Sequence, residues 1–357
     1  MGIAALEGIA VSELRSRSRR IFAATICALV IAASLAWTTP GRASGVPEEA
    51  GRTSLILVIG ADGDEQYGKI FAEEADLWRA TAAASDVKFA IIGGEKKTGE
   101  TASGSDKERL NTLLHAEVGV SGDIAQAAPL WIIFVGHGTF DGRTAAFNLR
   151  GPDVSSAELT DWLKDCKRPT AVVNTTAASA PFLTALSAPG RVIVTATKSG
   201  QERNYARFGR FFAKRVIDLA ADLDKDERTS LLEAYLAAAR DTADFYKSEG
   251  RIATEHPLLD DDGDGKGIRV DFFERDKLVK RPAGEQAVDG DTARRFALKP
   301  SASDAKLTAT QLTERDALET ELATLRSRKA ELPENEYFAE LERLLLKLAR
   351  LQVEPAK

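Results

Sequence analysis

One histidine of the chain stands where a reacting group could be used. His137 lies between two glycines, directly after the apolar run Leu130 to Val135. Two hydroxyl residues, Thr176 and Ser179, follow the next apolar run. A Ser or Thr hydroxyl is a weak nucleophile until a base such as histidine takes its proton. These residues suggest hydrolysis with His137 as general base; the alternative is that both hydroxyls only form turns or cap helices.

Three more polar residues follow apolar runs in the same way. Asp62 comes after Ser54 to Ile59, and Lys198 and Ser199 come after Arg191 to Thr195. Ligands of open parallel sheets bind beyond the carboxyl ends of the strands. We therefore expect Asp62, Lys198 and Ser199 to bind substrate, with Lys198 facing a carboxylate, unless its charge is only solvated.

An acidic loop at residues 222–233 has the spacing of an EF-hand. Oxygen-bearing side chains occupy its first, third, fifth, ninth and twelfth positions: Asp222, Asp224, Asp226, Ser230 and Glu233. Hard oxygen ligands in this pattern bind Ca²⁺. Glu227 replaces the glycine of the sharp turn, which predicts weaker binding. The alternative is that Ser230 and Glu233 only form a capping box for the following helix.

A second acidic loop spans residues 260–271. Asp260, Asp262 and Asp264 open it, with Gly265 correctly placed, but no acid stands at the ninth position and only Asp271 at the twelfth. Carboxylates this dense repel one another unless a cation or solvent intervenes. We predict Ca²⁺ as a possible cofactor that stabilises these loops and takes no part in catalysis.

The elements that must position these residues alternate along the chain. Short apolar runs typical of buried strands are separated by stretches with helical spacing, which predicts an α/β fold in three α-β-α layers with a mostly parallel sheet. The predicted strands are residues 54–59, 87–92, 130–135, 170–173 and 191–195, and the main helices follow at 67–82, 107–116, 155–163, 205–220 and 231–247.

Two segments resemble caspase-fold cysteine peptidases of the legumain type. In that family a strand ends in His-Gly, as IIFVGHG does here, and the first strand runs into a glycine-rich loop, a tyrosine and a helix, as in GADGDEQYGKIFAEEAD. The resemblance covers roughly residues 54–220 and implies a caspase-like fold. The family's next strand ends in an Asp/Glu-Ala-Cys-x-Ser-Gly turn, and alignment places Thr176 at the cysteine.

The missing cysteine has no replacement nearby. The chain contains only Cys27 and Cys166. Cys166 precedes the strand at 170–173, so we expect it at the opposite end of the sheet from His137. The resemblance therefore implies a degenerate peptidase that acts as a binding or scaffold module for a peptide or protein. One alternative is an active hydrolase that uses His137 with Thr176 or Ser179.

The N-terminus has the layout of an export signal. Residues 21–37 are uncharged and follow four arginines, of which Arg19 and Arg20 resemble a twin-arginine motif. We predict a signal peptide at 1–43, a linker at 44–53 and a periplasmic or extracellular protein without membrane contact after cleavage; a retained membrane anchor is the alternative. The net charge is −6, with no clustered basic face, so nucleic acid is not expected as a partner.

The tail differs in composition from the α/β domain predicted at 54–300. Residues 301–357 are rich in Leu, Glu, Lys, Arg and Ala, and leucines recur at helical spacing on both sides of Leu332-Pro333. This pattern predicts a helical hairpin. The hairpin either covers its own domain or joins another chain, which makes an oligomer possible and gives a second alternative function, that of a structural interaction protein.

Overall fold

The computed structural model describes residues 52–94, 104–119, 128–275, 277–279, 289–329 and 331–353. The predicted signal peptide (1–43), including Cys27, and residues 44–51 of the predicted linker lie outside these ranges. The following description concerns the described residues only.

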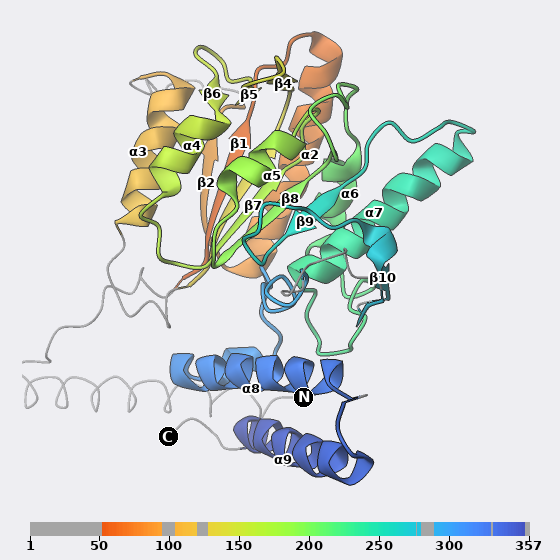
Figure 1. Cartoon of the computed structure of the whole chain (residues 1–357). Coiled ribbons are helices and arrows are strands. Elements are labelled where there is room, and N and C mark those ends of the chain that lie inside the picture. The colour runs from red at the N-terminus through yellow and green to blue at the C-terminus, as the bar shows by residue number, and fades with distance from the viewer. Residues whose placement is uncertain are drawn as a thin grey trace, which may run out of the picture. The chain divides into compact units, whose positions relative to one another are not determined.

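A six-stranded sheet forms the centre of the α/β domain (Figure 1). Its strand order is β2-β1-β3-β7-β8-β9. The first five strands in this order are parallel, whereas β9 pairs antiparallel with β8. The bounds are β1 (Ser54–Ile59), β2 (Lys88–Ile92), β3 (Leu130–Val135), β7 (Thr170–Asn174), β8 (Arg191–Thr195) and β9 (Leu258–Asp260).

Helices cover both faces of this sheet, which explains why its strands are almost continuously apolar. Along β1, Leu55 and Leu57 point into one core and Ile56 and Val58 into the other. The first core is closed by α2 (Glu65–Ser85), α6 (Phe208–Arg215) and α7 (Leu231–Ser248), and the second by α3 (Asp106–Val118), α4 (Ser156–Leu163) and α5 (Ala180–Leu186).

Smaller elements decorate the domain. A three-stranded antiparallel sheet follows His137 directly and consists of β4 (Gly138–Phe140), β5 (Ala145–Phe147) and β6 (Val154–Ser155). A short hairpin of β10 (Phe273–Glu274) and β11 (Lys277–Leu278) lies later in the chain, with 3-10 turns at η3 (Val270–Phe272) and η4 (Asp304–Lys306).

The predicted helical hairpin is present. It consists of α8 (Ala309–Ser327) and α9 (Glu334–Val353), which break at Leu332-Pro333. Leucines 318, 322 and 325 of α8 pack against Tyr337 and Leu344 of α9. Within the described part of the chain, no helix is long and apolar enough to cross a membrane.

The predicted fold class, an α/β domain in three layers with a mostly parallel sheet and a C-terminal hairpin, is confirmed. The element list needs corrections. Strand β9, helix α5 and the β4-β5-β6 sheet were not predicted, β2 begins at Lys88, and β7 extends to Asn174. The helix expected at 205–220 is shorter, because Glu255 accepts hydrogen bonds from the backbone N–H groups of Arg207 and Phe208 and so fixes its start.

Candidate functional site

His137 lies at the carboxyl end of β3 and packs against two aromatic side chains. Its ring meets Tyr67 edge-on at 4.8 Å between centroids and Phe71 at 5.1 Å. The Nε2 atom lies 3.1 Å from the backbone carbonyl oxygen of Asp62. Because a carbonyl oxygen only accepts, Nε2 must carry the proton and donate it in this contact. That nitrogen is therefore occupied as a donor and does not serve as a base in this arrangement.

Thr176 follows β7 and comes close to the histidine strand. A Cβ atom added to Gly138 would lie 2.4 Å from both Thr176 Oγ1 and the Ala177 carbonyl oxygen, so only glycine permits this approach. The structure thus brings together the two segments that the sequence predicted to meet. In the described residues, however, no hydrogen bond joins the His137 ring to the Thr176 hydroxyl.

The Thr176 hydroxyl is fully buried and already committed. It has no exposed surface, and it donates to the side-chain oxygen of Asn174 at 2.7 Å, with the Ala177 carbonyl as a second acceptor at 3.1 Å. The same Asn174 oxygen accepts the Thr176 backbone N–H. A single hydroxyl proton is therefore held between two acceptors inside the turn, which is a structural arrangement and leaves no path for an incoming carbonyl carbon.

Ser179 is equally buried and ties two elements together. Its Oγ accepts the backbone N–H groups of Ala196 and Thr197 at 3.1 and 3.2 Å and lies 3.1 Å from Thr197 Oγ1. These bonds connect the end of β8 to the start of α5. Both oxygen lone pairs are used, so Ser179 also lacks the freedom of a nucleophile.

Within the described residues, no hydrogen bond or ion pair joins the three residues that were predicted to bind substrate. Asp62 offers its carbonyl to His137, and its carboxyl packs against Gly68 of α2. Lys198 is exposed and faces Glu202 at 3.8 Å, and its backbone N–H donates to the same carboxylate. Ser199 accepts from the Gln201 N–H. Asp62 and Lys198 are both exposed and charged, whereas Ser199 is half-buried.

Cys166 lies where the sequence placed it, ahead of β7 and so at the opposite end of the parallel sheet from His137. Its sulfur lies 3.5 Å from the Thr170 hydroxyl and is partly buried. The expectation that Cys166 cannot replace the missing nucleophile is consistent with this position.

Glu74 is a buried acid beside the site that the sequence analysis did not single out. It projects from α2 toward Thr175 and Gly209, where an added Cβ would meet Glu74 Oε1 and the Thr175 side chain, both at 2.5 Å. Burial raises the pKa of Glu74 from 4.5 to about 8, while Thr175 and Arg210 oppose the rise. The Thr175 hydroxyl donates to the Phe134 carbonyl oxygen at 2.7 Å. Glu74 is therefore a neutral acid near pH 7.

Tyr205 completes this neighbourhood. Its ring lies 5.4 Å from Tyr67 and 6.4 Å from Phe71. Burial raises the pKa of the Tyr205 hydroxyl, and the nearby Glu74 adds to the rise. In the sequence, Glu74 occurs in the helical register of Phe71 and Trp78, and this position on the buried face is the only signal that could have found it.

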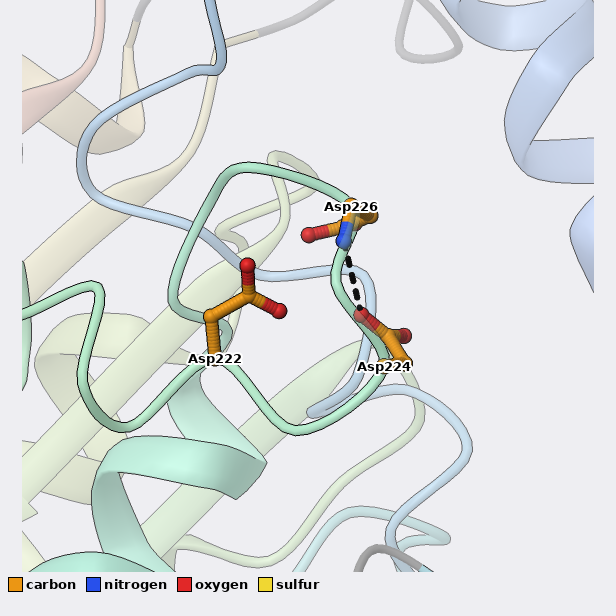
Figure 2. A group of neighbouring side chains, drawn as sticks. All are labelled: Asp222, Asp224 and Asp226. Atoms are coloured by element: carbon orange, nitrogen blue, oxygen red, sulfur yellow. Dashed lines mark hydrogen bonds between the residues drawn. The ribbon is translucent and has the colours of Figure 1, made fainter.

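The first acidic loop forms a compact cluster of three aspartates (Figure 2). One carboxylate oxygen from each of Asp222, Asp224 and Asp226 lies within 4.8 Å of the others. Burial, together with the neighbouring charges of Asp226 and Glu233, raises the pKa of Asp224 to about 7. The three carboxylates thus converge and repel, as oxygen ligands of a hard cation do.

Ser230 and Glu233, the two other ligands expected in this loop, bind the backbone. Ser230 accepts the Glu233 N–H, and the Glu233 carboxylate accepts the Ser230 N–H, which is the capping box of α7. The second Glu233 oxygen accepts the N–H of Leu223 at 2.6 Å. The capping box of the alternative is therefore present, and the aspartate cluster does not include Glu233.

The second loop repeats the geometry of the first. Asp260, Asp262 and Asp264 also bring one oxygen each within 4.8 Å. In both loops the first aspartate accepts the N–H groups of the fourth and sixth residues, which are Lys225 and Glu227 in one loop and Gly263 and Gly265 in the other. All four of these residues have positive φ. Glu227 therefore adopts the positive φ of the glycine that it replaces, and weaker calcium binding in this loop stays a prediction.

Comparisons with known proteins give remote structural likenesses. No family model matches the chain, and no curated protein does. The chain is similar to the Drosophila initiator caspase Dronc, with 13% identity and a TM-score of 0.35 over 62% of this chain and 84% of that one. For caspase-1 of Spodoptera frugiperda the values are 9%, 0.40, 66% and 96%, and for a protein of Geobacter sulfurreducens 11%, 0.37, 58% and 92%. Likenesses this remote carry no function to the chain.

Proposed function

We propose that this protein is a degenerate caspase/legumain-like protein that binds a peptide or protein at the carboxyl ends of its strands without cleaving it. The observation that carries the proposal is that the two candidate nucleophiles are buried and hydrogen-bonded. Thr176 and Ser179 are both fully buried, and each is held by at least two hydrogen bonds: Thr176 within its own turn, and Ser179 to the backbone at the end of β8. A nucleophile must reach the scissile carbonyl and give its proton to a base, and neither hydroxyl is placed for this.

The rival function is hydrolysis through His137. In its favour, the histidine strand and the Thr176 turn touch at Gly138. Activation would require the turn to open, since the Thr176 hydroxyl now donates to the side-chain oxygen of Asn174 and His137 Nε2 donates to the carbonyl oxygen of Asp62. Opening would expose the polar atoms that the turn now satisfies, and each buried group left without a partner costs about 1–3 kcal/mol.

A single experiment separates the two functions. A diverse peptide library is offered to the protein and to the variants His137→Ala, Thr176→Ala and Ser179→Ala, and binding and cleavage are recorded on the same peptides. We expect binding without cleavage, and weaker binding in Lys198→Gln because the positive charge of Lys198 is exposed and was predicted to face a substrate carboxylate. Cleavage that disappears in His137→Ala and in one hydroxyl variant would overturn the proposal. Thr176→Ser, which keeps the hydroxyl, is the matched control.

We also propose that the two acidic loops bind Ca²⁺. The supporting observation is the repeated geometry, because two loops of different sequence converge on the same hydrogen-bond pattern and the same aspartate cluster. A ligand that binds only the folded state stabilises it, by about 2.7 kcal/mol at one hundred times its dissociation constant. The bound ion would brace the loops and take no part in chemistry.

Thermal unfolding with and without millimolar calcium tests this second proposal. We expect calcium to raise the midpoint, and the double variants Asp222→Asn/Asp224→Asn and Asp260→Asn/Asp262→Asn each to remove part of the rise. Asp244→Asn, an exposed aspartate outside both loops, is the control. An equal rise in all variants would refute binding at the loops.

Export is part of the proposal and depends on residues 1–43. The four arginines, the uncharged run at 21–37 and the small residues after Pro40 support a cleaved signal. N-terminal sequencing of protein recovered from the producing cell's periplasm or medium tests it. A start near residue 44 is expected, whereas an intact N-terminus in the membrane fraction would favour the anchor.

A further inference from the structure

The turn after β7, residues 175–179, lies between segments that continue from both neighbouring strands. In the sheet order β7 is placed between β3 and β8, and the register aligns Phe134, Asn174 and Thr195 near the carboxyl ends of the three strands. The chain that leaves β3 passes into β4, and the chain that leaves β8 forms a loop at residues 198–203, which we call the strap. The turn is therefore flanked by β4 on one side and by the strap on the other.

These two flanking segments touch each other across the turn. The Phe140 ring of β4 packs so closely on Gly200 of the strap that a Cβ atom at Gly200 would overlap ring atoms. The φ of Gly200 is not positive, so glycine is needed here for the close approach and not for the backbone conformation. A guanidinium N–H of Arg203 also donates to the Phe140 carbonyl oxygen at 3.4 Å. Phe140 and the strap thus close over the turn.

A backbone hydrogen bond ties the strap to the turn. The Glu202 carbonyl oxygen accepts the N–H of Ala178 at 2.8 Å. Ala178 has a φ of 52°, in the left-handed region that is unfavourable for a residue with a Cβ atom. Residues in such conformations persist only where the surrounding structure holds them, and they cluster at ligand clamps and switch regions. The strap therefore helps to hold the turn in a conformation that Ala178 alone would not favour.

We propose that the strap is an autoinhibitory cover, and that the peptide-binding surface at the carboxyl ends of the strands becomes complete only when Phe140 and Gly200 separate. Separation uncovers the turn, in which Thr176 and Ser179 now have no exposed surface. The inference rests on the proposed peptide binding, because it states how that same site is regulated. A protein that binds only in a minor open state has an apparent affinity reduced by the open fraction. Breaking the contact should therefore tighten peptide binding.

Separate contacts preserve the fold of the strap itself. The Glu202 carboxylate accepts the backbone N–H of Lys198 at 3.0 Å and lies 2.5 Å from Nδ1 of His256, in the segment before β9. These bonds keep the loop folded and tied to that segment, whereas the Phe140 contact fixes where the loop lies over the turn. Substitutions at Phe140 or Gly200 should therefore displace the strap without unfolding it.

Amide hydrogen exchange of the full chain tests whether the contact holds the strap closed. Phe140→Ala removes the covering ring and Gly200→Ala places a methyl group into it, so each should speed exchange at the Ala178 N–H by about tenfold or more. Phe338→Ala, at an exposed position, and Gly142→Ala, which has open space, are the matched controls. Exchange in β1 reports global unfolding and should rise less. Unchanged exchange at Ala178, or an equal rise in β1, would overturn the proposal.

Binding of the labelled peptide library to the same variants tests the inhibition. Peptides should bind Phe140→Ala and Gly200→Ala about tenfold more tightly than the parent protein, and the two controls should match the parent. A parent that binds as tightly as both variants, or variants that bind more weakly, would overturn the inhibition and leave the proposed binding intact. Absence of binding in the parent and in every variant would instead overturn the proposed function, and the strap would then be a structural contact only.

Discussion

Replacing Glu74 with glutamine should stabilise the protein, and increasingly so as pH rises. Glutamine keeps the size of the side chain and removes the titration. The carboxyl of Glu74 is buried between α2, Thr175 directly after β7 and Gly209 of α6, with Arg210, Tyr205 and Glu255 as its charged or titratable neighbours. Its Oε1 atom has no hydrogen-bond partner. Ionisation therefore places a charge where neither water nor a full set of donors supports it.

The magnitude comes from the two pKa values. The folded protein holds the Glu74 proton to a pKa of about 8, whereas the unfolded chain releases it near 4.5. The folded state binds the proton more tightly, so the group's contribution to stability is fully present below pH 4.5 and is lost as pH rises toward 8. The loss relative to low pH is about 3 kcal/mol at pH 7 and about 5 kcal/mol above pH 8.

Urea unfolding of the protein and of Glu74→Gln at pH 5, 7 and 9 measures this directly. The difference in unfolding free energy should be under about 1 kcal/mol at pH 5 and should grow to several kcal/mol at pH 9. Burial also raises the pKa of Asp224 and Asp289, but these groups are present in both proteins and cancel in the difference. Glu73→Gln removes an exposed charge from the same helix turn and is the control.

Two results would refute the reasoning. A difference that does not change with pH would show that Glu74 ionises normally in the folded protein. A variant that is less stable than the parent at every pH would show that the carboxylate is held by donors that the structure does not contain.

Three other substitutions test packing and polar contacts, two of them at the candidate site and one at the first acidic loop. Gly138→Ala should destabilise the protein by about 2–3 kcal/mol in thermal unfolding, because its methyl would overlap Thr176, whereas Gly142→Ala has open space and should lose about 1 kcal/mol through its positive φ alone. Ser179→Ala should lower the free energy of unfolding by about 2–3 kcal/mol in urea because it leaves two backbone N–H groups without an acceptor, and Ser199→Ala, at a half-buried position, should lower it little. Arg228→Met should cost about 3 kcal/mol and speed hydrogen exchange in α8, because this buried arginine pairs with Asp226 and Glu319, while Arg326→Met should not.

The central strands could be predicted from the sequence because parallel strands covered on both faces must be apolar throughout. The runs at β1 and β3 are of this kind, and their predicted bounds agree with the structure. Strand β9 could not be found in this way. Its sequence, Leu258 to Asp260, is three residues long and leads into an acidic loop, so only its pairing with β8 makes it a strand.

The position of the candidate site could be predicted from the sequence, but the sequence left open whether its hydroxyls are free to react. Parallel connectivity places the ends of β3 and β7 together, and His137 and Thr176 follow from it. Asn174 lies two residues before Thr176, so the local turn that holds the Thr176 hydroxyl belongs to the turn-forming alternative stated above, whereas the Thr197 partner of Ser179 is 18 residues away and no local pattern links the two. Glu74 was not predicted as a site residue because a glutamate on a helix is usually solvated. Only the approach of Gly209 from α6 buries its carboxyl.

The absence of a side chain at Gly138 has a consequence for how this protein can change by mutation. Any larger residue there would strike the Thr176 turn, and any rearrangement of that turn would release hydrogen bonds made by Asn174. The residues at positions 138, 174 and 176 therefore depend on one another, and a substitution at one of them is unfavourable unless the others change as well. Replacing Thr176 with cysteine alone would weaken the hydrogen bonds of this turn without producing a reactive thiol. A return to a cysteine nucleophile by single substitutions is therefore unfavourable.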